Sequence, residues 1–525
     1  MDIGLIQKAI IFTRCGKIAE AENLYKTLLA ENPEEVPLLS AAGLFYTELK
    51  DYNKASEFLQ KAYNLKKTFG TVSALGFCEY TKKEYRTSAI YLEEALEYGQ
   101  NIDIFDKLIA SLFEIKGYKK AIEYSNKMYE LYPNDTRAIA NKIKSLTQSG
   151  KLREAEELCV ESIKKNPEAP ILWFHLGYLK ELIYRDDKQA IECYKIAEKY
   201  GANEANYNIA VGFQKLGQKK EAEKYYKKML EFFPNDEETM TSLGMCLLSQ
   251  KKFNEGYKLF CKRDAKPIEK YSNNIWKTGD KIENDIIVFC EQGFGDHIQF
   301  IRYLPFINAK KIQVAAPKQL RKLFESNYPK FNFIDYSEIN PTKQVLRVTD
   351  LAYILGMDFD NIPFSEGYLK AEKTDIQSDK LKIGLCWEAG AAGIRTMINR
   401  TIHVKFFERF FNNENIQTYS FQYDDTFNGC EKFPQMINLA KGFKDFADTA
   451  SAIKAMDAII SVDTSVAHLA GALGVKTYLL LPYSSDWRWF DDTKTTPWYK
   501  SVKIFKQTDP ISWEEPLAGI EKELF

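Results

Sequence analysis

A short motif recurs along the first half of the chain at an almost constant spacing. Each copy ends in a small residue, and successive small residues lie 34, 33, 33, 34, 35, 32 and 34 positions apart. These residues are Ala21, Ala55, Ser88, Ala121, Ala155, Ala190, Ala222 and Gly256. A fixed period of this length indicates stacked copies of one helical hairpin, which bury their core between neighbouring repeats.

Two further features accompany the small residue. A bulky side chain follows four positions later in most copies: Tyr25, Leu59, Leu92, Tyr194, Tyr226 and Phe260. A proline follows twelve positions later in four copies: Pro33, Pro133, Pro167 and Pro234. The small residue lets two helices approach closely, the large one fills the next groove, and proline ends the helix before the next repeat.

This pattern resembles the tetratricopeptide repeat family over roughly residues 2–265. We therefore expect an α-solenoid of about eight repeats at 1–270. The resemblance implies a long concave face that binds an extended peptide or a partner protein, and not a catalyst.

Composition excludes several classes of protein. The chain has 72 basic and 73 acidic residues, so bulk charge gives no support for nucleic-acid binding. No apolar stretch reaches the roughly 18 residues that a membrane span needs, and the N-terminus does not read as a secretory signal. The nine cysteines are scattered singly, which favours reduced thiols in a cytoplasmic protein over disulfides or a zinc site.

After about residue 270 the pattern changes to strand-length apolar runs that alternate with helical stretches. The runs are 286–290, 312–316, 383–387, 458–462 and 477–481. Such alternation predicts parallel sheets wound with helices. A charged connection near 358–382 divides this half into a smaller lobe at 271–375 and a larger one at 376–525.

Two strand-to-helix junctions are candidate ligand sites, because ligands of wound sheets lie at the carboxyl ends of strands. At the first, Gly293 and Gly295 flank a tight turn, and Asp296 opens a helix. At the second, Asp463, Thr464 and Ser465 leave a strand and start a helix, whose free N–H groups suit a phosphate. Simple helix capping is the alternative at both. Neither matches a dinucleotide or ATPase fingerprint.

The segment 445–490, with 497–507 after it, resembles bacterial tetratricopeptide-repeat proteins fused to a glycosyltransferase domain similar to the lipopolysaccharide heptosyltransferase family. The segments EQGFGDHIQFIRYLP and IGLCWEAG match the same pattern in order. The resemblance implies a GT-B architecture of two Rossmann-type lobes. It also implies a nucleotide-sugar donor bound mainly on the C-terminal lobe, with no cofactor and no obligatory metal.

Sugar transfer with inversion needs a base for the acceptor hydroxyl. Asp296 is the best candidate on its glycine-flanked turn, and the aspartate of this motif has that role in the heptosyltransferase-like pattern. Capping of its helix is the alternative. His297 is a second candidate, although adjacent helical residues point about 100° apart, so that only one of the two is expected to face the site.

The departing nucleotide phosphate needs positive charge and N–H donors. The helix that starts after Asp463 supplies donors, and Arg395, Arg400 and Arg488 are the candidate cations. Arg488 lies between two tryptophans, where packing is an equal alternative. His468, one turn into that helix, and Gln422, after a strand, complete the candidate donor contacts.

The leading hypothesis is a cytoplasmic glycosyltransferase whose repeats hold a protein acceptor, with flagellar or surface proteins as candidates. Tethering would raise the acceptor's effective concentration at the cleft. One alternative is transfer to a glycan or a lipid-linked saccharide. The other is a non-catalytic repeat adaptor with a degenerate transferase domain.

Overall fold

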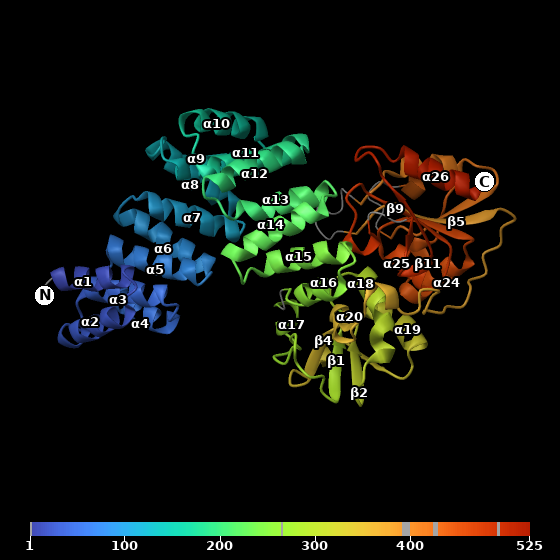
Figure 1. The fold of residues 1–525 in the computed structure, drawn as a ribbon, viewed down its shortest axis with the longest axis horizontal. Coiled ribbons are helices and arrows are strands. Elements are labelled where there is room, and N and C mark those ends of the chain that lie inside the picture. Colours follow the sequence, from blue (N-terminus) through green and yellow to red (C-terminus); the bar gives the residue numbers. More distant parts are fainter. Residues whose placement is uncertain (1–2, 264–265, 391–399, 424–428, 491–493) are drawn as a thin grey trace. The chain divides into compact units, whose positions relative to one another are not determined.

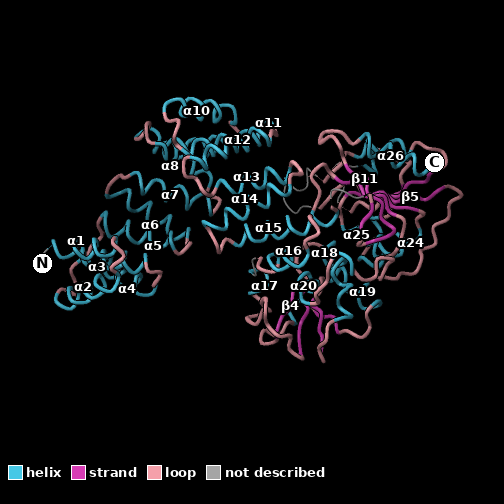
Figure 2. The backbone as a smooth tube through the Cα atoms, in the orientation of Figure 1, coloured by secondary structure: helices cyan, strands magenta, loops and turns pink. Residues whose placement is uncertain are grey.

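The computed structural model describes residues 3–263, 266–390, 400–423, 429–490 and 494–525. The chain divides into two compact units, Met1–Ala205 and Asn206–Phe525. Helices alone make up the first unit, whereas strands occur only in the second (Figures 1 and 2).

The first unit consists of helical hairpins in series. Its helices are α1 (Ile3–Arg14), α2 (Ile18–Glu31), α3 (Val36–Glu48), α4 (Tyr52–Leu65), α5 (Phe69–Thr81), α6 (Tyr85–Tyr98), α7 (Ile102–Glu114), α8 (Tyr118–Leu131), α9 (Thr136–Gln148), α10 (Leu152–Lys165), α11 (Pro170–Tyr184) and α12 (Asp187–Lys199). The expected small residues fall on every second helix. Those of this unit are fully buried, as the spacing predicted: Ala21, Ala55, Ser88, Ala121, Ala155 and Ala190.

Close helix packing explains the pairing of small and bulky residues. A Cβ added to Gly43 of α3 would lie 2.4 Å from Cγ of Leu59, and one added to Gly76 of α5 would lie 2.5 Å from Cδ2 of Leu92. Leu59 and Leu92 of the second helices therefore fill the space over a glycine of the first. Pro33 follows the end of α2 by two residues, where it ends the helix as predicted.

The second unit begins with two more hairpins of the same kind. They are formed by α13 (Ala205–Lys215), α14 (Lys219–Phe232), α15 (Glu237–Ser249) and α16 (Phe253–Phe260). Ala222 and Gly256, the last two small residues of the repeat pattern, are buried there. The repeat pattern therefore continues into the unit that contains the sheets.

Two sheets follow. The first has the order β3-β2-β1-β4, is parallel throughout, and contains β1 (Asp285–Phe289), β2 (Lys311–Ala315), β3 (Asn332–Ile334) and β4 (Gln344–Arg347). The second has the order β10-β11-β9-β8-β5-β6-β7. Its strands are β5 (Leu381–Cys386), β6 (Ile416–Ser420), β7 (Ile437–Asn438), β8 (Ala458–Val462), β9 (Thr477–Leu481), β10 (Thr495–Thr496) and β11 (Tyr499–Lys506). Only the β10–β11 pair is antiparallel.

The α/β class is confirmed, and all five predicted strands are present. The helices around the sheets are α17 (Lys266–Glu269), α18 (Phe294–Phe300), α19 (Lys318–Asn327), α20 (Leu351–Ile354), α22 (Glu408–Phe411), α23 (Gly429–Lys432), α24 (Phe446–Ala455), α25 (Ser465–Ala472) and α26 (Glu514–Leu524). Short 3₁₀ helices include η1 (Ile301–Phe306), η3 (Val348–Asp350), η4 (Phe359–Asn361) and η7 (Trp487–Trp489).

Strand order fixes where a ligand can bind. In the first sheet the chain runs outward from β1 to β3 and then returns to the other side of β1 with β4. In the second it runs from β5 to β7 and returns to the other side of β5 with β8. The loops on either side of each reversal separate at the carboxyl ends of the strands and leave a crevice. Both predicted junctions, after β1 and after β8, lie at these reversals.

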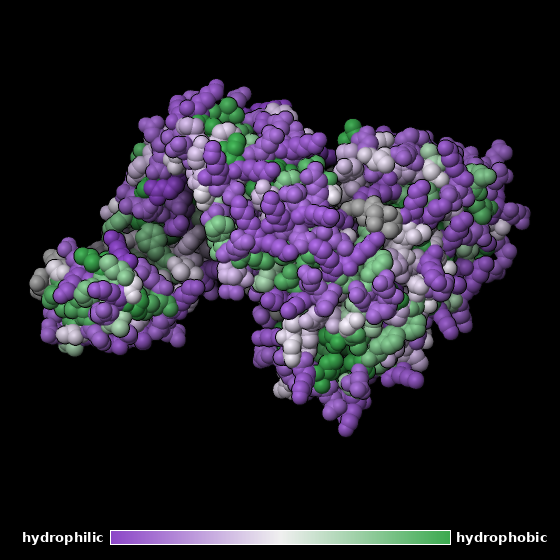
Figure 3. Space-filling view, viewed as in Figure 1, coloured by the Kyte–Doolittle hydropathy of each residue, from purple (hydrophilic) through white to green (hydrophobic). Residues whose placement is uncertain are grey.

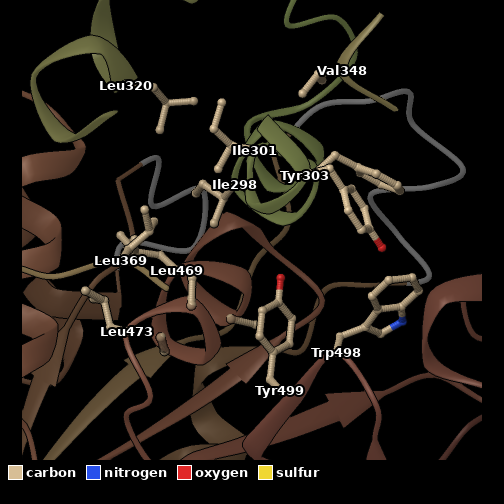
Figure 4. Packing of buried hydrophobic residues seen from close by; sticks show 14 of the residues in the cluster. Ile298, Ile301, Tyr303, Leu320, Val348, Leu369, Leu469, Leu473, Trp498 and Tyr499 are labelled. Carbon is tan, nitrogen blue, oxygen red and sulfur yellow. The ribbon is translucent and has the colours of Figure 1, made fainter. Parts of the chain in front are cut away.

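One apolar core joins the two sheets' helices. Ile298, Ile301 and Tyr303 of α18 and η1 face Leu469 of α25, together with Trp498 and Tyr499 (Figure 4), and all of them are buried. Among the described residues, no helix is both long and apolar enough to cross a membrane. Hydrophilic residues cover most of the face drawn in Figure 3.

Candidate functional site

The turn after β1 presents Asp296 through two contacts. Its Oδ2 accepts a hydrogen bond from the Gly293 amide at 3.1 Å, and its Oδ1 forms an ion pair with the Arg488 guanidinium. The capping alternative is thus realised, but it occupies only one of the two carboxylate oxygens. The other reaches a residue of the second sheet.

The glycines of this turn act differently from expectation. Neither Gly293 nor Gly295 has a positive φ; the left-handed conformation falls on Gln292, with φ of +73°. Gly295 is required instead by close approach, because a Cβ there would lie 2.8 Å from Cδ2 of His468. The glycine lets α18 pack directly on α25.

His297 points away from Asp296 and into the packing of the turn. Its side chain is 3% exposed, and its Nε2 lies 2.9 Å from the carbonyl oxygen of Glu291. Burial lowers the pKa of this imidazole to about 4, so the ring is neutral near pH 7. This position favours Asp296 over His297 as the group that faces a ligand.

The second junction supplies the N-terminus of α25. Thr464 is the residue before the helix, and its hydroxyl contacts Ser461 Oγ at 3.0 Å and does not cap α25. Thr464 and Ser465 are half-buried. The amide groups of the first helical turn therefore have no cap from the Thr464 side chain, which is the arrangement that suits an anion.

Asp463 and His468 lie beneath that helix start. Asp463 is 5% exposed, and burial, followed by the nearby Asp486 carboxylate, raises its pKa. His468 Nδ1 lies 3.0 Å from the Tyr499 hydroxyl, and its Nε2 lies 3.8 Å from Asp463 Oδ1. Burial lowers the pKa of His468 to about 3, so that its contact with Asp463 is made by a neutral ring.

Arg488 links the two sheets. Its Nη1 contacts Asp486 Oδ1 at 2.7 Å, its Nη2 pairs with Asp296, and its guanidinium carbon lies 4.5 Å from the centre of the Trp487 ring. Burial opposes its charge, but Asp296 and Asp486 raise its pKa above the ordinary value. The packing alternative for this arginine is therefore present, since it stacks on Trp487 and also holds two carboxylates. Its predicted contact with a donor phosphate stays a prediction.

Arg400 is the second cation at the site. Its Nη1 lies 3.3 Å from Asp463 Oδ2, and its Nε is buried without a hydrogen-bond partner. Its side chain is 24% exposed, so it is the cation of the cluster that a ligand reaches most directly. Arg395, the third predicted cation, lies outside the described residues.

Gln422 holds the loop after β5. Its Oε1 accepts hydrogen bonds from the Trp387 amide at 3.3 Å and the Glu388 amide at 2.9 Å, and its Nε2 donates to the Glu388 carbonyl at 3.2 Å. With this geometry Gln422 shapes the crevice beside β5. Its predicted contact with a donor stays a prediction.

The arrangement gathers three aspartates and two arginines at the carboxyl ends of both sheets. Asp486 was not singled out from the sequence, although it directly precedes the Trp-Arg-Trp motif that drew attention to Arg488. Such a site can bind an anion if the arginines exchange a carboxylate for it. Among the described residues, no group of three or more His, Cys, Asp or Glu side chains is placed to hold a metal ion.

Comparison with known proteins identifies the repeats. The model of the tetratricopeptide repeat matches residues 36–69 and 204–236. Protein FlbA of Caulobacter vibrioides is 22% identical to this chain, with 100% of this chain and 96% of that protein covered. The anaphase-promoting complex subunit CDC16 of Saccharomyces cerevisiae is 22% identical over 47% of this chain and 31% of its own length.

Two solved structures each resemble a little under half of the chain. A tetratricopeptide repeat protein from Parabacteroides merdae covers 46% of this chain and 98% of its own, at 16% identity and a TM-score of 0.42. Yeast Tom70 covers 46% of this chain and 54% of its own, at 18% identity and a TM-score of 0.40. Together, the matched residues, the period of the buried small residues and the sixteen consecutive helices α1–α16 identify the N-terminal half as an array of tetratricopeptide repeats.

Proposed function

We propose that the second unit transfers a sugar from a nucleotide-sugar donor to an acceptor hydroxyl. The observation that carries the proposal is the ion pair between Asp296 and Arg488, which joins the crevice of the first sheet to that of the second. A base candidate on one sheet thus lies beside a phosphate-binding candidate on the other. The two parallel sheets support the further proposal of a GT-B arrangement, which the sequence resemblance implies.

The donor diphosphate would bind at the N-terminus of α25. Arg400 reaches this helix start through its ion pair with Asp463, and the half-buried start of the helix supplies N–H donors and the positive end of a dipole. Both features stabilise the negative charge that develops as the bond between the sugar and the diphosphate breaks. The nucleoside diphosphate then leaves with the electron pair of that bond.

Asp296 would accept the proton of the attacking hydroxyl. In the unliganded arrangement Arg488 occupies its Oδ1, so Arg488 must first exchange this carboxylate for the donor phosphate. The same exchange that binds the donor therefore frees the base. The acceptor oxygen forms the new bond to the sugar's anomeric carbon, and its proton moves to Asp296.

The acceptor is proposed to be a protein held by the repeat array, because arrays of this family present long binding faces. We also infer a reducing compartment such as the cytoplasm. Seven of the nine cysteines are buried free thiols, the state that such a compartment favours.

A non-catalytic adaptor is the second candidate. It is favoured by the fact that Asp296, Asp463 and Arg488 each already have a partner of opposite charge within the chain. A transferase needs these pairs to exchange with a ligand, whereas an adaptor needs them only for stability.

Release of nucleoside diphosphate separates the two candidates. The full chain is incubated with a panel of nucleotide sugars, with and without a cell lysate as a source of acceptor. The transferase releases diphosphate from at least one donor, and Arg488→Leu lowers that rate, whereas Arg409→Leu, at an exposed pair with Glu514, does not. A folded wild-type protein that releases none from any donor supports the adaptor.

A further inference from the structure

The chain just after α16 forms a buried ionic junction with the first sheet. Arg263 Nη1 lies 2.6 Å from Asp350 Oδ1, and its Nη2 forms an ion pair with Glu291 and a hydrogen bond with Thr349. Its side chain is 9% exposed and that of Glu291 is 8% exposed. Arg347 completes the junction, with its Nε 2.8 Å from Asp350 Oδ2.

Glu291 connects this junction to the candidate base. It is the second residue after β1, and its carbonyl oxygen is bound by the His297 ring. The next residue, Gln292, has φ of +73°, a conformation that non-glycine residues keep only when their neighbours hold it. The turn then reaches Gly293, whose amide binds Asp296. Three residues, Glu291, Gln292 and Gly293, therefore join Arg263 to Asp296.

The other half of the site rests on the same helix. Tyr257 and Phe260 of α16 pack on Trp487, with ring centres 6.0 and 6.1 Å apart. Phe253 stacks on Trp498 at 5.8 Å, and the Trp498 indole donates a hydrogen bond to the Arg488 carbonyl at 2.7 Å. The backbone on both sides of the Arg488 side chain is therefore set by α16.

We propose that the last repeat hairpin positions both turns of the candidate site, with Arg263 as the positioning residue for the turn that carries Asp296. The positioning role itself does not depend on the proposed sugar transfer. If that transfer takes place, Arg263 controls nucleotide binding and turnover without touching either substrate. The repeat array and the catalytic half then share one structural element, α16, and a change in that hairpin moves Asp296 and Arg488 relative to each other.

A purely structural junction would behave differently. If Arg263 only fastened a repeat to a sheet, its loss would loosen the hairpin and leave the turn at 291–296 as ordered as before. Loss of a positioning residue instead makes the turn itself more mobile, because Glu291 then lacks the group that holds it and the strained Gln292 relaxes. Local hydrogen exchange separates these cases without any ligand.

The experiment compares Arg263→Met and Arg263→Lys with Arg321→Met in the full chain. Arg321 of α19 forms a surface pair with Asp335, 3.1 Å away and directly after β3, and is the matched control. Hydrogen exchange is followed at the amides of Gly293, Asp296 and His297, which bond within the turn. Binding of uridine, guanosine, cytidine, adenosine and thymidine diphosphates is measured by calorimetry on the same samples.

We expect exchange at the turn to rise about tenfold in Arg263→Met while exchange in β1 is unchanged, with partial rescue in Arg263→Lys and none of this in Arg321→Met. The Kd of the best-bound diphosphate should weaken about fivefold or more in Arg263→Met. If exchange at the turn rises in Arg263→Met while the wild-type protein binds none of the diphosphates, the positioning role is supported and sugar transfer is not. Unchanged exchange at the turn, or a rise spread evenly over the second unit, overturns the positioning role.

Discussion

The two compact units differ in how deeply they bury ion pairs. Many pairs of the first lie on the surface, as do Lys120 and Glu93, which are 2.7 Å apart with side chains 57% and 36% exposed. In the second, Arg263 and Asp350 are 2.6 Å apart with side chains 9% and 1% exposed. Surface pairs contribute little, whereas buried charges are costly and persist only with good partners. Buried charge that the fold itself does not need is a sign of a functional site.

The first unit achieves its stability by repetition. Each hairpin contributes a small buried residue, and in most of them a bulky one follows four positions later, so that the interfaces resemble one another. The second unit contains features that occur once, such as the left-handed Gln292 and the fully buried Arg302, which contacts the carbonyl of Trp498 at 3.0 Å. From this comparison we propose that the array acts through its surface and the second unit through its buried charges.

The largest effect is expected at Asp296. If its substitution had no more effect than that of a surface acid, the contrast between the two units would fail. Asp296→Asn should lower the sugar-transfer rate by about 100-fold or more at saturating donor, because general bases contribute about 10² to 10⁴. Asp335→Asn is the matched control, since Asp335 also caps a turn and pairs with an arginine. A variant that keeps the full rate would exclude Asp296 as the base.

Buried histidine makes the second unit sensitive to acid. The pKa of His297 is about 4 in the folded chain against an ordinary value near 6.5, so folding excludes its proton. The contribution of this neutral ring to the free energy of unfolding is fully present above about pH 6.5. About 3 kcal/mol is lost as the pH falls toward 4. The free energy of unfolding, measured with urea at several pH values, should fall less steeply with decreasing pH in His297→Gln than in the wild type. Equal slopes would contradict the burial of a neutral ring.

Repetition makes the first unit sensitive to volume instead of charge. Gly76→Ala places a methyl group 2.5 Å from Leu92 in a buried interface, so it should destabilise the first unit by roughly 1–3 kcal/mol. Gly70→Ala, on the same helix with nothing nearer than 3.9 Å, should change stability by less than about 1 kcal/mol. Thermal unfolding of both variants checks the contrast, which fails if they behave alike.

The smallest effect is expected at the surface pairs of the array. Lys120→Ala should lower the free energy of unfolding by about 0.2–1 kcal/mol. Lys119→Ala, on the same exposed stretch, is the control, and the difference in stability between the two variants should shrink in 1 M salt. Chemical denaturation in low and high salt measures it. A loss above about 2 kcal/mol would show that the array also depends on its charges.

The sequence alone predicted features that are repeated or local. The period of the small residues predicted the hairpins, and apolar runs predicted β8 and β9 to the residue, because both signals arise within a few positions. Strands of only two or three residues, such as β3 and β7, are too short to give such a signal. The division of the chain at Ala205 was also hidden, since the repeat pattern continues across it.

The sequence predicted the two turns of the candidate site but not the contacts between them. Asp296 and Asp463 follow strands, so their place at a carboxyl edge could be inferred, but the 192 positions between Asp296 and Arg488 carry no trace of their ion pair. The inward orientation of His297 depends on the Glu291 carbonyl, and the need for Gly295 depends on His468. Such contacts between distant segments are decided by packing.

Calorimetric titration of the full chain with nucleoside diphosphates and nucleotide sugars tests most directly whether the buried ion pairs of the second unit form a donor site. We predict that at least one nucleotide binds with a Kd below about 1 mM, and that Arg400→Met weakens it about tenfold. Folded protein that binds none of them, or that binds equally well without Arg400, would contradict a donor site at Asp463, Arg400 and Arg488.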